Sequence, residues 1–520
     1  MMKRIMNKSA LFLLLAGLAL GSCKKQLEID PRQSIDAETA LTSREAIDAS
    51  ITSIYSRLKS ARWYGRDMIT HPDVLADNVH ATNASGRLLG ESNNVFGAHF
   101  TGTIWSSGFA GINQINLTID AVNGGIPLAS TADVNRWLGN LFFLRGLFYF
   151  DMARVYGYIP GAVVDAQNRG SVPLVLTGIK DATTALAFRP SRAPIDEVFA
   201  QVVKDLEESE RLLAASTAPS AVANKTAAQA LLARVQLYRK NYTEAKRWAD
   251  AVITARGNTL GTVANYVPNW RAENHPETIF QIRFATNAEN IGVNESLQTS
   301  YTTIVTLPGT SSATGGFGDA VPTLDLLNEL GITLTGGNTN ANFTGPRSLV
   351  ASRSTDVRNL LYESGTAGRT KGWVECTKFL GKNGFINLDN VPVLRIAEMY
   401  LIRAEIAATT GASTFNEAAA RADLQTLKRN RYTDYAGSAQ ETADAALTGQ
   451  ALFNEIMRQR RLEFAFEGHR FFDFKRLGLP ILKGAPNPNP AVAFTDARIL
   501  PPIPQGDVDG NPNLRQNFGY

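Results

Sequence analysis

The pattern of apolar residues over 225–253 predicts two packed helices, and with them a helical body for this chain. Apolar side chains recur at helical spacing on both sides of Asn241 and Tyr242, which places a turn between two helices. Small side chains at Ala233 and Ala245 allow the helices to approach closely. We expect an antiparallel helical hairpin with Tyr242 packed at its bend.

A second, less regular unit of the same kind spans 392–429. Its apolar residues keep helical spacing as far as Ala404, and Gly411 marks the bend. Both units resemble tetratricopeptide hairpins, although the period of about 34 residues does not repeat strictly. Such hairpins are structural or partner-binding and carry no chemistry of their own. The sequence therefore predicts a mostly α fold on a tetratricopeptide-like helical hairpin scaffold.

A long irregular segment separates the two hairpins. Residues 257–389 are rich in Gly, Thr and Asn, and the segment is too long for a plain loop inside a compact fold. We expect an inserted, loop-rich subdomain of short helices, short strands and irregular structure there. The single body would then span residues 37–520, with an N-terminal part at about 37–256 and a C-terminal part at about 390–520. Other helices are expected over residues 37–58, 104–122 and 132–156, and from Pro194 to about residue 213.

The N-terminus carries an export signal. Three basic residues precede an unbroken apolar run over 10–20, which is far shorter than the ~20 residues needed to span a bilayer. Small residues then lead directly into Cys23, in a pattern similar to a bacterial lipobox. Residues 1–22 are therefore predicted to be a lipoprotein signal peptide, and residues 23–36 an acylated Cys23 with its polar tether. An ordinary signal peptide followed by an accidental cysteine is the alternative.

The composition points away from several classes of protein. The chain has 520 residues, 44% of them hydrophobic, and a formal charge of +4 that includes three positive charges in the predicted signal peptide. This small net charge gives no indication of nucleic-acid binding. Two cysteines exclude a disulfide framework, and Cys376 is expected to be a buried thiol.

Motifs for catalysis are missing from the sequence. It contains no His-Glu-x-x-His, Gly-x-Ser-x-Gly, Walker loop or Cys-x-x-Cys. His71, His80 and His99 share one segment without metal-ligand spacing, and hydrogen-bonded loop histidines are the alternative to a zinc site. Paired carboxylates of a glycoside hydrolase stay open, because their separation is a tertiary property. We predict no catalytic residue, no metal and no cofactor.

The densest run of charge lies at residues 458–473 and alternates ionic side chains with phenylalanines. We interpret it as a structural ion network in which Arg460 pairs with Glu463, and Glu467 with Arg470, at a spacing of three residues. A catalytic or anion-binding site is the alternative.

The same run resembles the C-terminal signature of the SusD/RagB family of Bacteroidota outer-membrane lipoproteins, in which R-R-x-E-x-x-F-E-G-x-R-x-x-D is typical. Further segments that resemble the family follow in its order over almost the whole chain. They are the lipobox at Cys23, residues 143–160, the hairpin at 228–253, Asp356-Val357-Arg358, residues 394–405 and the ending from Pro502 to Tyr520.

This resemblance implies a helical scaffold whose inserted, loop-rich part binds ligands. It also implies a non-catalytic nutrient-uptake lipoprotein, anchored in the outer membrane and exposed at the cell surface. Such a protein captures glycans and passes them to a SusC-like TonB-dependent transporter. A peptide or other non-sugar cargo on the same scaffold is one alternative, and a surface glycoside hydrolase is another. No nucleic-acid partner is expected.

Two segments combine flat aromatic rings with planar polar groups, the side chains that bind the C–H faces and hydroxyls of sugars. The first comprises expected loops over 63–100, where Asp77 and Asn78 resemble a common family pair, and the second begins at Tyr266. Each ring also fits core packing, and Trp105 is expected in the core. The predicted ligand-binding residues are Asp77, Asn78, His80, Asn83, Arg87, Tyr266, Trp270 and Tyr301.

Overall fold

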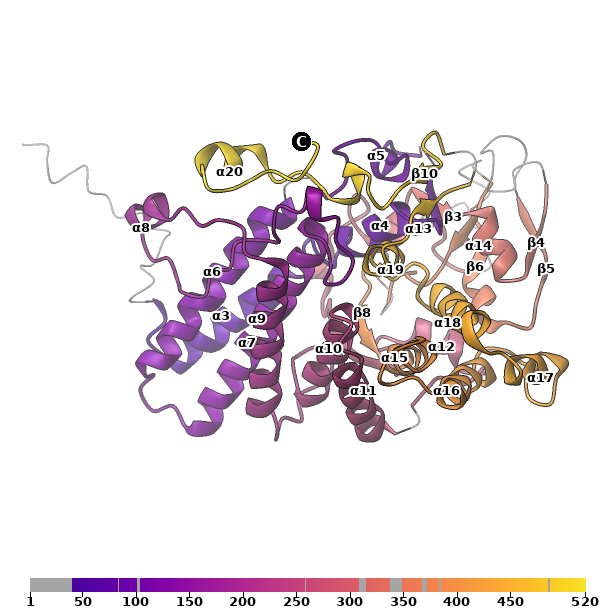
Figure 1. The fold of residues 1–520 in the computed structure, drawn as a ribbon, viewed down its shortest axis with the longest axis horizontal. Coiled ribbons are helices and arrows are strands. Elements are labelled where there is room, and N and C mark those ends of the chain that lie inside the picture. Colours follow the sequence, from indigo (N-terminus) through magenta and orange to yellow (C-terminus); the bar gives the residue numbers. More distant parts are fainter. Residues whose placement is uncertain are drawn as a thin grey trace, which may run out of the picture.

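Helices are the main secondary structure of the molecule, with short strands and irregular segments between them (Figure 1). The computed structural model describes residues 40–520 except 83, 101–102, 258, 308–314, 337–347, 367–371, 383–384 and 485–486. The predicted mostly α fold on helical hairpins is confirmed. The predicted signal peptide, Cys23 and the tether lie outside the described residues, and so does Asn83.

Four long helices pack side by side in the left half of the molecule as Figure 1 shows it. They correspond to the four helices expected from apolar spacing. Helix α7 contacts α9, α6 and α3, so it lies at the centre of this group. The four are α3 (Arg44–Arg57), α6 (Thr103–Gly124), α7 (Thr131–Tyr156) and α9 (Ile195–Leu212).

Local sequence fixes where α7 begins and how closely α9 approaches it. Ser130 Oγ accepts a hydrogen bond from the Asp133 N–H, and the Asp133 carboxylate accepts one from the Ser130 N–H, which together form a capping box. Further along α7, a Cβ at position 139 would lie 2.6 Å from Leu213 Cγ. Glycine at this position therefore lets the end of α9 lie directly against α7.

The two predicted hairpins exist and stack on each other. The first consists of α10 (Lys225–Tyr238) and α11 (Tyr242–Arg256), and the second of α15 (Ile396–Ala408) and α16 (Glu417–Arg429). Helix α11 packs against α15, so units far apart in the sequence lie side by side in the middle of Figure 1. Asn241 caps α11 by accepting a hydrogen bond from the Glu244 N–H, which explains the turn at the predicted place.

The loop-rich segment between the hairpins is joined to the rest of the chain by strand pairing. Strand β2 (Thr278–Ile282) pairs antiparallel with β8 (Val391–Arg395), and β1 (Val79–Ala81) pairs with β3 (Ala320–Pro322). Each pairing joins the predicted insertion to a neighbouring part of the body. The division of the body at residues 256 and 389 stays a prediction.

The remaining elements surround these pairings and hairpins. The helices are α4 (Asp67–Val74), α5 (Leu89–Ser92), α8 (Ala182–Ala187), α12 (Tyr266–Arg271), α13 (Leu297–Tyr301), α14 (Leu324–Glu329), α17 (Ala439–Ala445), α18 (Gly449–Phe464), α19 (Arg470–Leu477) and α20 (Gln505–Gly510). The antiparallel strand pairs are β4 (Ile332–Thr335) with β5 (Leu349–Arg353), β6 (Tyr362–Ser364) with β7 (Val374–Cys376), and β9 (Ile481–Leu482) with β10 (Ala491–Val492).

A buried network of alternating charges joins the insertion to the C-terminal part. Glu463 on α18 accepts hydrogen bonds from Arg395 Nη1 at 2.9 Å and from Arg431 Nε at 2.8 Å. The same two arginines bind Glu277, which directly precedes β2, at 2.8 and 2.9 Å. All four side chains are at most 1% exposed. Each charge therefore has opposite charges around it, as a buried ion requires.

The predicted ion network at residues 458–473 is confirmed, but the predicted pairs within it were wrong. Arg460 binds Asp473 at 3.0 Å, and Arg470 binds Asp77 at 2.8 Å. Glu467 lies in the turn between α18 and α19 and binds Lys378 and Arg395 instead of Arg470. The reason is that these side chains point into the core, where partners from distant segments replace those three residues away.

Two further observations complete the fold. Cys376 is a fully buried free thiol, as expected, and burial raises its pKa to about 12. Among the described helices, none is both long enough and apolar enough to cross a membrane.

Candidate ligand-binding cleft

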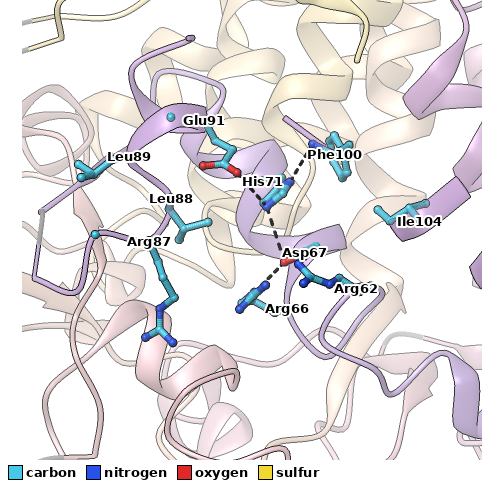
Figure 2. Close-up of a pocket in the computed structure, with 12 residues that line it drawn as sticks. Arg62, Arg66, Asp67, His71, Arg87, Leu88, Leu89, Glu91, Phe100 and Ile104 are labelled. Carbon is cyan, nitrogen blue, oxygen red and sulfur yellow. Dashed lines mark hydrogen bonds and ion pairs between the residues drawn. The ribbon is translucent and has the colours of Figure 1, made fainter. Parts of the chain in front are cut away.

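A cleft of about 280 Å³ opens between α4, the segment around α5 and the start of α6. Figure 2 shows apolar side chains on two opposite sides, with most of the charged side chains between them. The apolar residues are Leu88, Leu89, Phe100 and Ile104, and the polar residues are Arg62, Arg66, Asp67, His71, Arg87 and Glu91. This mixture of apolar surface with a few convergent polar groups is typical of a ligand site.

Asp67 lies at the base of the cleft and organises the charges next to it. Its carboxylate accepts a hydrogen bond from Arg66 Nε at 2.7 Å and lies 3.5 Å from Arg62 Nη1. His71 Nε2 is 3.6 Å from the same carboxylate. The Asp67 side chain is only 3% exposed, so it holds neighbouring cations in place and is not itself open to a ligand.

His71 connects the helix α4 to both walls of the cleft. Its Nδ1 accepts a hydrogen bond from the Phe100 N–H at 3.3 Å, and its Nε2 lies 3.7 Å from Glu91. Because Nδ1 accepts, the ring proton is on Nε2 in the neutral form. The Nε2 side of the imidazole therefore faces the carboxylates of Asp67 and Glu91 at ion-pair distance, as the dashed lines in Figure 2 indicate.

Arg87 lies at the edge of the cleft and is held from behind. Its Nη2 donates to Asp319 at 2.6 Å, and its Nε donates to the same oxygen at 3.1 Å. The guanidinium also lies over the ring of Phe317, 4.9 Å from its centre. Arg87 is thus the predicted ligand-binding residue that the structure places in the cleft.

The backbone around the cleft adopts conformations that side chains other than glycine rarely take. Leu88 and Phe100 both line the cleft and have φ angles of 61° and 47°, and Asn94 between them has a φ of 48°. Left-handed backbone at a bulky residue costs about 1–2 kcal/mol. Such strain clusters at functional sites, where surrounding structure maintains it, and this supports the cleft as the functional site.

Asp77, Asn78 and His80 lie away from the cleft in structural roles. Asp77 receives two hydrogen bonds from Arg470, at 2.8 and 2.9 Å, and the Asn78 side-chain oxygen accepts one from Arg461 at 2.7 Å. Burial acts to raise the pKa of Asp77, but the hydrogen bonds and charge of Arg470 outweigh it and leave this pKa below its usual range. His80 is 3% exposed within β1.

The predicted aromatic site at Tyr266, Trp270 and Tyr301 needs correction, because the three rings are at most 1% exposed. The Tyr266 ring lies under the guanidinium of Arg431, 4.6 Å from its centre. Tyr301 donates a hydrogen bond to Asp73 at 3.0 Å, and burial raises the pKa of that carboxyl to about 8. These rings cover the buried charges and are not available to stack on a sugar.

Most of the cleft comes from the segment 63–100 that the sequence marked for ligand binding, while Arg62 and Ile104 lie just outside it. The structure of this segment also differs from the expected loops. Helices α4 and α5 occupy this segment, and α4 is buried along its whole length. Arg62, Arg66, Asp67 and Glu91 were missed as site residues. A cluster of charges next to the tryptophan at position 63 was the available signal, but their convergence depends on the path of the chain.

A second groove, of about 450 Å³, lies between α6, α8 and α20. Its walls include Phe109 and Phe188, and Trp105, which is 3% exposed and therefore belongs to the core as predicted. This groove is an alternative location for an aromatic-stacked ligand. The described residues include no group of three or more His, Cys, Asp or Glu side chains that could hold a metal ion.

The stacked hairpins define the class of the molecule as a tetratricopeptide-like helical scaffold, and comparison with known proteins identifies the family. Residues 344–520 match the SusD family, and residues 26–237 match a family described as starch-binding associating with outer membrane. This chain belongs to the SusD/RagB family, as its sequence motifs indicated.

Individual relatives are similar over nearly their whole length. SusD-like protein P38 of Formosa agariphila is 23% identical over all of both chains. The crystal structure of a SusD superfamily protein from Bacteroides thetaiotaomicron has a TM-score of 0.75 and 25% identity, over 91% of this chain and 99% of the other. A laminarin binding SusD-like protein has a TM-score of 0.64 and 17% identity, over 92% of this chain and 100% of the other.

Proposed function

We propose that this chain is a non-catalytic lipoprotein that binds oligosaccharides or polysaccharides and delivers them to a SusC-like TonB-dependent transporter in the outer membrane. The family matched by residues 26–237 is described as starch-binding and outer-membrane-associated, and one structural relative binds laminarin. Both support a glycan as the cargo, and the family description also supports the outer membrane as the location.

The cleft in Figure 2 is the observation that carries this proposal. Leu89, which is partly exposed, offers apolar surface to the C–H face of a sugar, and the buried Leu88, Phe100 and Ile104 support the walls behind it. Arg62 supplies hydrogen-bond donors and Glu91 supplies acceptors, which together match the hydroxyls of a saccharide. Leu88 and Phe100 both have left-handed backbone in the cleft. Such strained backbone is expected where the surrounding structure holds a binding site in a fixed geometry.

Attachment to the membrane would depend on Cys23. Acyl chains contribute about 0.8 kcal/mol for each buried CH₂, so an acylated cysteine holds a chain at a bilayer. We expect Cys23→Ala to abolish incorporation of labelled palmitate and to release the protein from outer-membrane fractions. A labelled Cys23→Ala protein would contradict acylation at this residue.

Native affinity gels test binding and catalysis together. The full chain is run through gels that contain plant, host or microbial polysaccharides, and the release of reducing ends is assayed in parallel. We expect retardation by a glycan without new reducing ends. Release of ends would contradict the non-catalytic role, and retardation by none would redirect the search to peptide cargo.

Matched variants then locate the binding surface. Glu91→Ala should reduce retardation, whereas Glu208→Ala on α9 should leave it unchanged, because that carboxylate pairs with Arg211 away from the cleft. Phe109→Ala and Phe188→Ala test the second groove. Copurification of the wild-type chain with a SusC-like transporter tests delivery, and its absence from detergent-solubilised complexes would contradict that part of the proposal.

A further inference from the structure

We infer that the preferred glycan carries an anionic group, either a carboxylate or a sulfate ester, and that Arg62 binds this group. The inference rests on the proposed function and narrows its cargo from glycans in general to acidic ones. It depends on the charges that line the cleft and on how far each of them is already paired.

The exposed charge of the cleft is mainly positive. Its lining contains three guanidinium groups and two carboxylates. The side chains of Arg62 and Arg87 are 51% and 26% exposed, whereas those of Asp67 and Glu91 are 3% and 18% exposed. An incoming ligand therefore meets more accessible cationic surface than anionic surface.

Two of the three arginines already pair with carboxylates that do not line the cleft. Arg87 binds Asp319, and Arg66 binds Glu295 in addition to Asp67. Their guanidinium groups hold the wall of the cleft in place, so they have little capacity left for an acidic ligand.

Arg62 differs from both. Within the part of the chain that the structure describes, its charged partner is Asp67 at 3.5 Å, and its guanidinium makes no hydrogen bond. Asp67 is shared with Arg66 and His71. The planar donors of Arg62 are thus free to bind a ligand, and their fork geometry matches the paired oxygens of a carboxylate or a sulfate.

Polar side chains form a row between the two ends of the cleft. Glu91 lies 3.7 Å from His71, His71 lies 3.6 Å from Asp67, and Asp67 lies 3.5 Å from Arg62. Figure 2 shows this order, with Glu91 and Arg62 at the two ends. An acidic sugar can place its anionic group at Arg62 and its hydroxyls toward Glu91, so the added negative charge lies at the opposite end of the row from Glu91.

Pairs of glycans that differ only in charge test the inference. Oligogalacturonate is compared with its methyl ester, and a sulfated carrageenan oligomer with its desulfated form, by calorimetric titration of the full chain. Laminarin serves as a neutral glycan. We expect at least one acidic form to bind about tenfold or more tightly than its neutral partner, and this preference to weaken with added salt. The pair that shows it distinguishes carboxylate from sulfate.

Variants of Arg62 identify the residue responsible. Arg62→Gln should lower affinity for the acidic form about tenfold and erase its preference over the neutral form, whereas Arg62→Lys should keep part of the preference. Arg211→Gln on α9 is the matched control, because this arginine is exposed and pairs with Glu208 away from the cleft, and it should leave binding unchanged. Circular dichroism checks that each variant is folded.

Three results would overturn the inference. If laminarin or a neutral form binds at least as tightly as the acidic forms, the proposed function stands and the acidic preference is wrong. If the preference survives in Arg62→Gln, Arg62 is not the residue that creates it. If no glycan of either kind binds, the proposed function fails together with this inference.

Discussion

At the scale of single residues, the molecule contains two kinds of unfavourable feature that neighbouring groups compensate. One is left-handed backbone at bulky residues, which occurs at Leu88 and Phe100 in the cleft and also at Leu128 on the surface. The other is buried charge, which is matched by opposite charges from distant segments, as at Glu463. For each kind, we predict how a substitution outside the cleft changes the stability of the protein.

Leu128 offers a clean measure of backbone strain because its side chain is 93% exposed while its φ is 60°. Leu128→Gly should raise the free energy of unfolding by about 0.5 kcal/mol, since relief of left-handed strain exceeds the added entropy of glycine. Urea denaturation measures the change. Leu186→Gly in α8 is the control and should lower stability, because it replaces a helix former without relieving strain. A destabilised Leu128→Gly would contradict this account.

Asp77 predicts a dependence of stability on pH. Its pKa in the folded protein lies below the usual range, so the stabilisation from its pair with Arg470 is full above the unfolded pKa of about 4. That stabilisation is lost as the pH falls through the folded pKa. Asp77→Asn should cost about 2 kcal/mol at pH 7, a value between those of exposed and buried pairs.

Urea denaturation at several pH values between 3 and 7 measures this effect of Asp77. The difference between wild type and Asp77→Asn should shrink toward pH 3. A difference that stays constant over this range would show that the variant acts through packing and not through the charge of Asp77.

At the scale of elements, apolar periodicity was sufficient to predict α3, α6, α7, α9 and the two hairpins, but not short helices such as α4 or the contacts between distant segments. The hairpin of α10 and α11 was predictable because its packing is local, with Asn241 capping the second helix. The pairing of β1 with β3 joins segments separated by more than two hundred residues, and no local pattern encodes it. The same reason explains why Asp77 was expected to bind a ligand when its partner is Arg470.

The buried ion network makes a prediction about how the elements hold together. Glu463→Gln leaves Arg395 and Arg431 without much of their compensating charge, and should cost about 3–5 kcal/mol of stability. Glu244→Gln is the matched control because its pair with Arg247 is largely exposed, so it should cost less than about 1 kcal/mol. Equal effects of the two substitutions on urea denaturation would contradict a structural role for the network.

At the scale of the whole molecule, the helical scaffold positions a small polar cleft on one side of the body. The family motifs made the fold and the family predictable from the sequence, because their residues form the ion network and the hairpins. The cleft was only partly predictable. Its segment and Arg87 were identified, but Arg62 and Glu91 converge through the packing of α4 against the 86–100 segment, which sequence spacing does not show.

Amide hydrogen exchange of the full chain, with and without a glycan that retards it in affinity gels, tests most directly whether the cleft binds the glycan. We expect bound glycan to slow exchange at residues 62–71 and 86–100, which form most of the cleft. Protection confined to residues 105–113 and 185–190 would place the ligand in the second groove. That result, or no protection at all, would contradict the assignment of the cleft as the glycan-binding site.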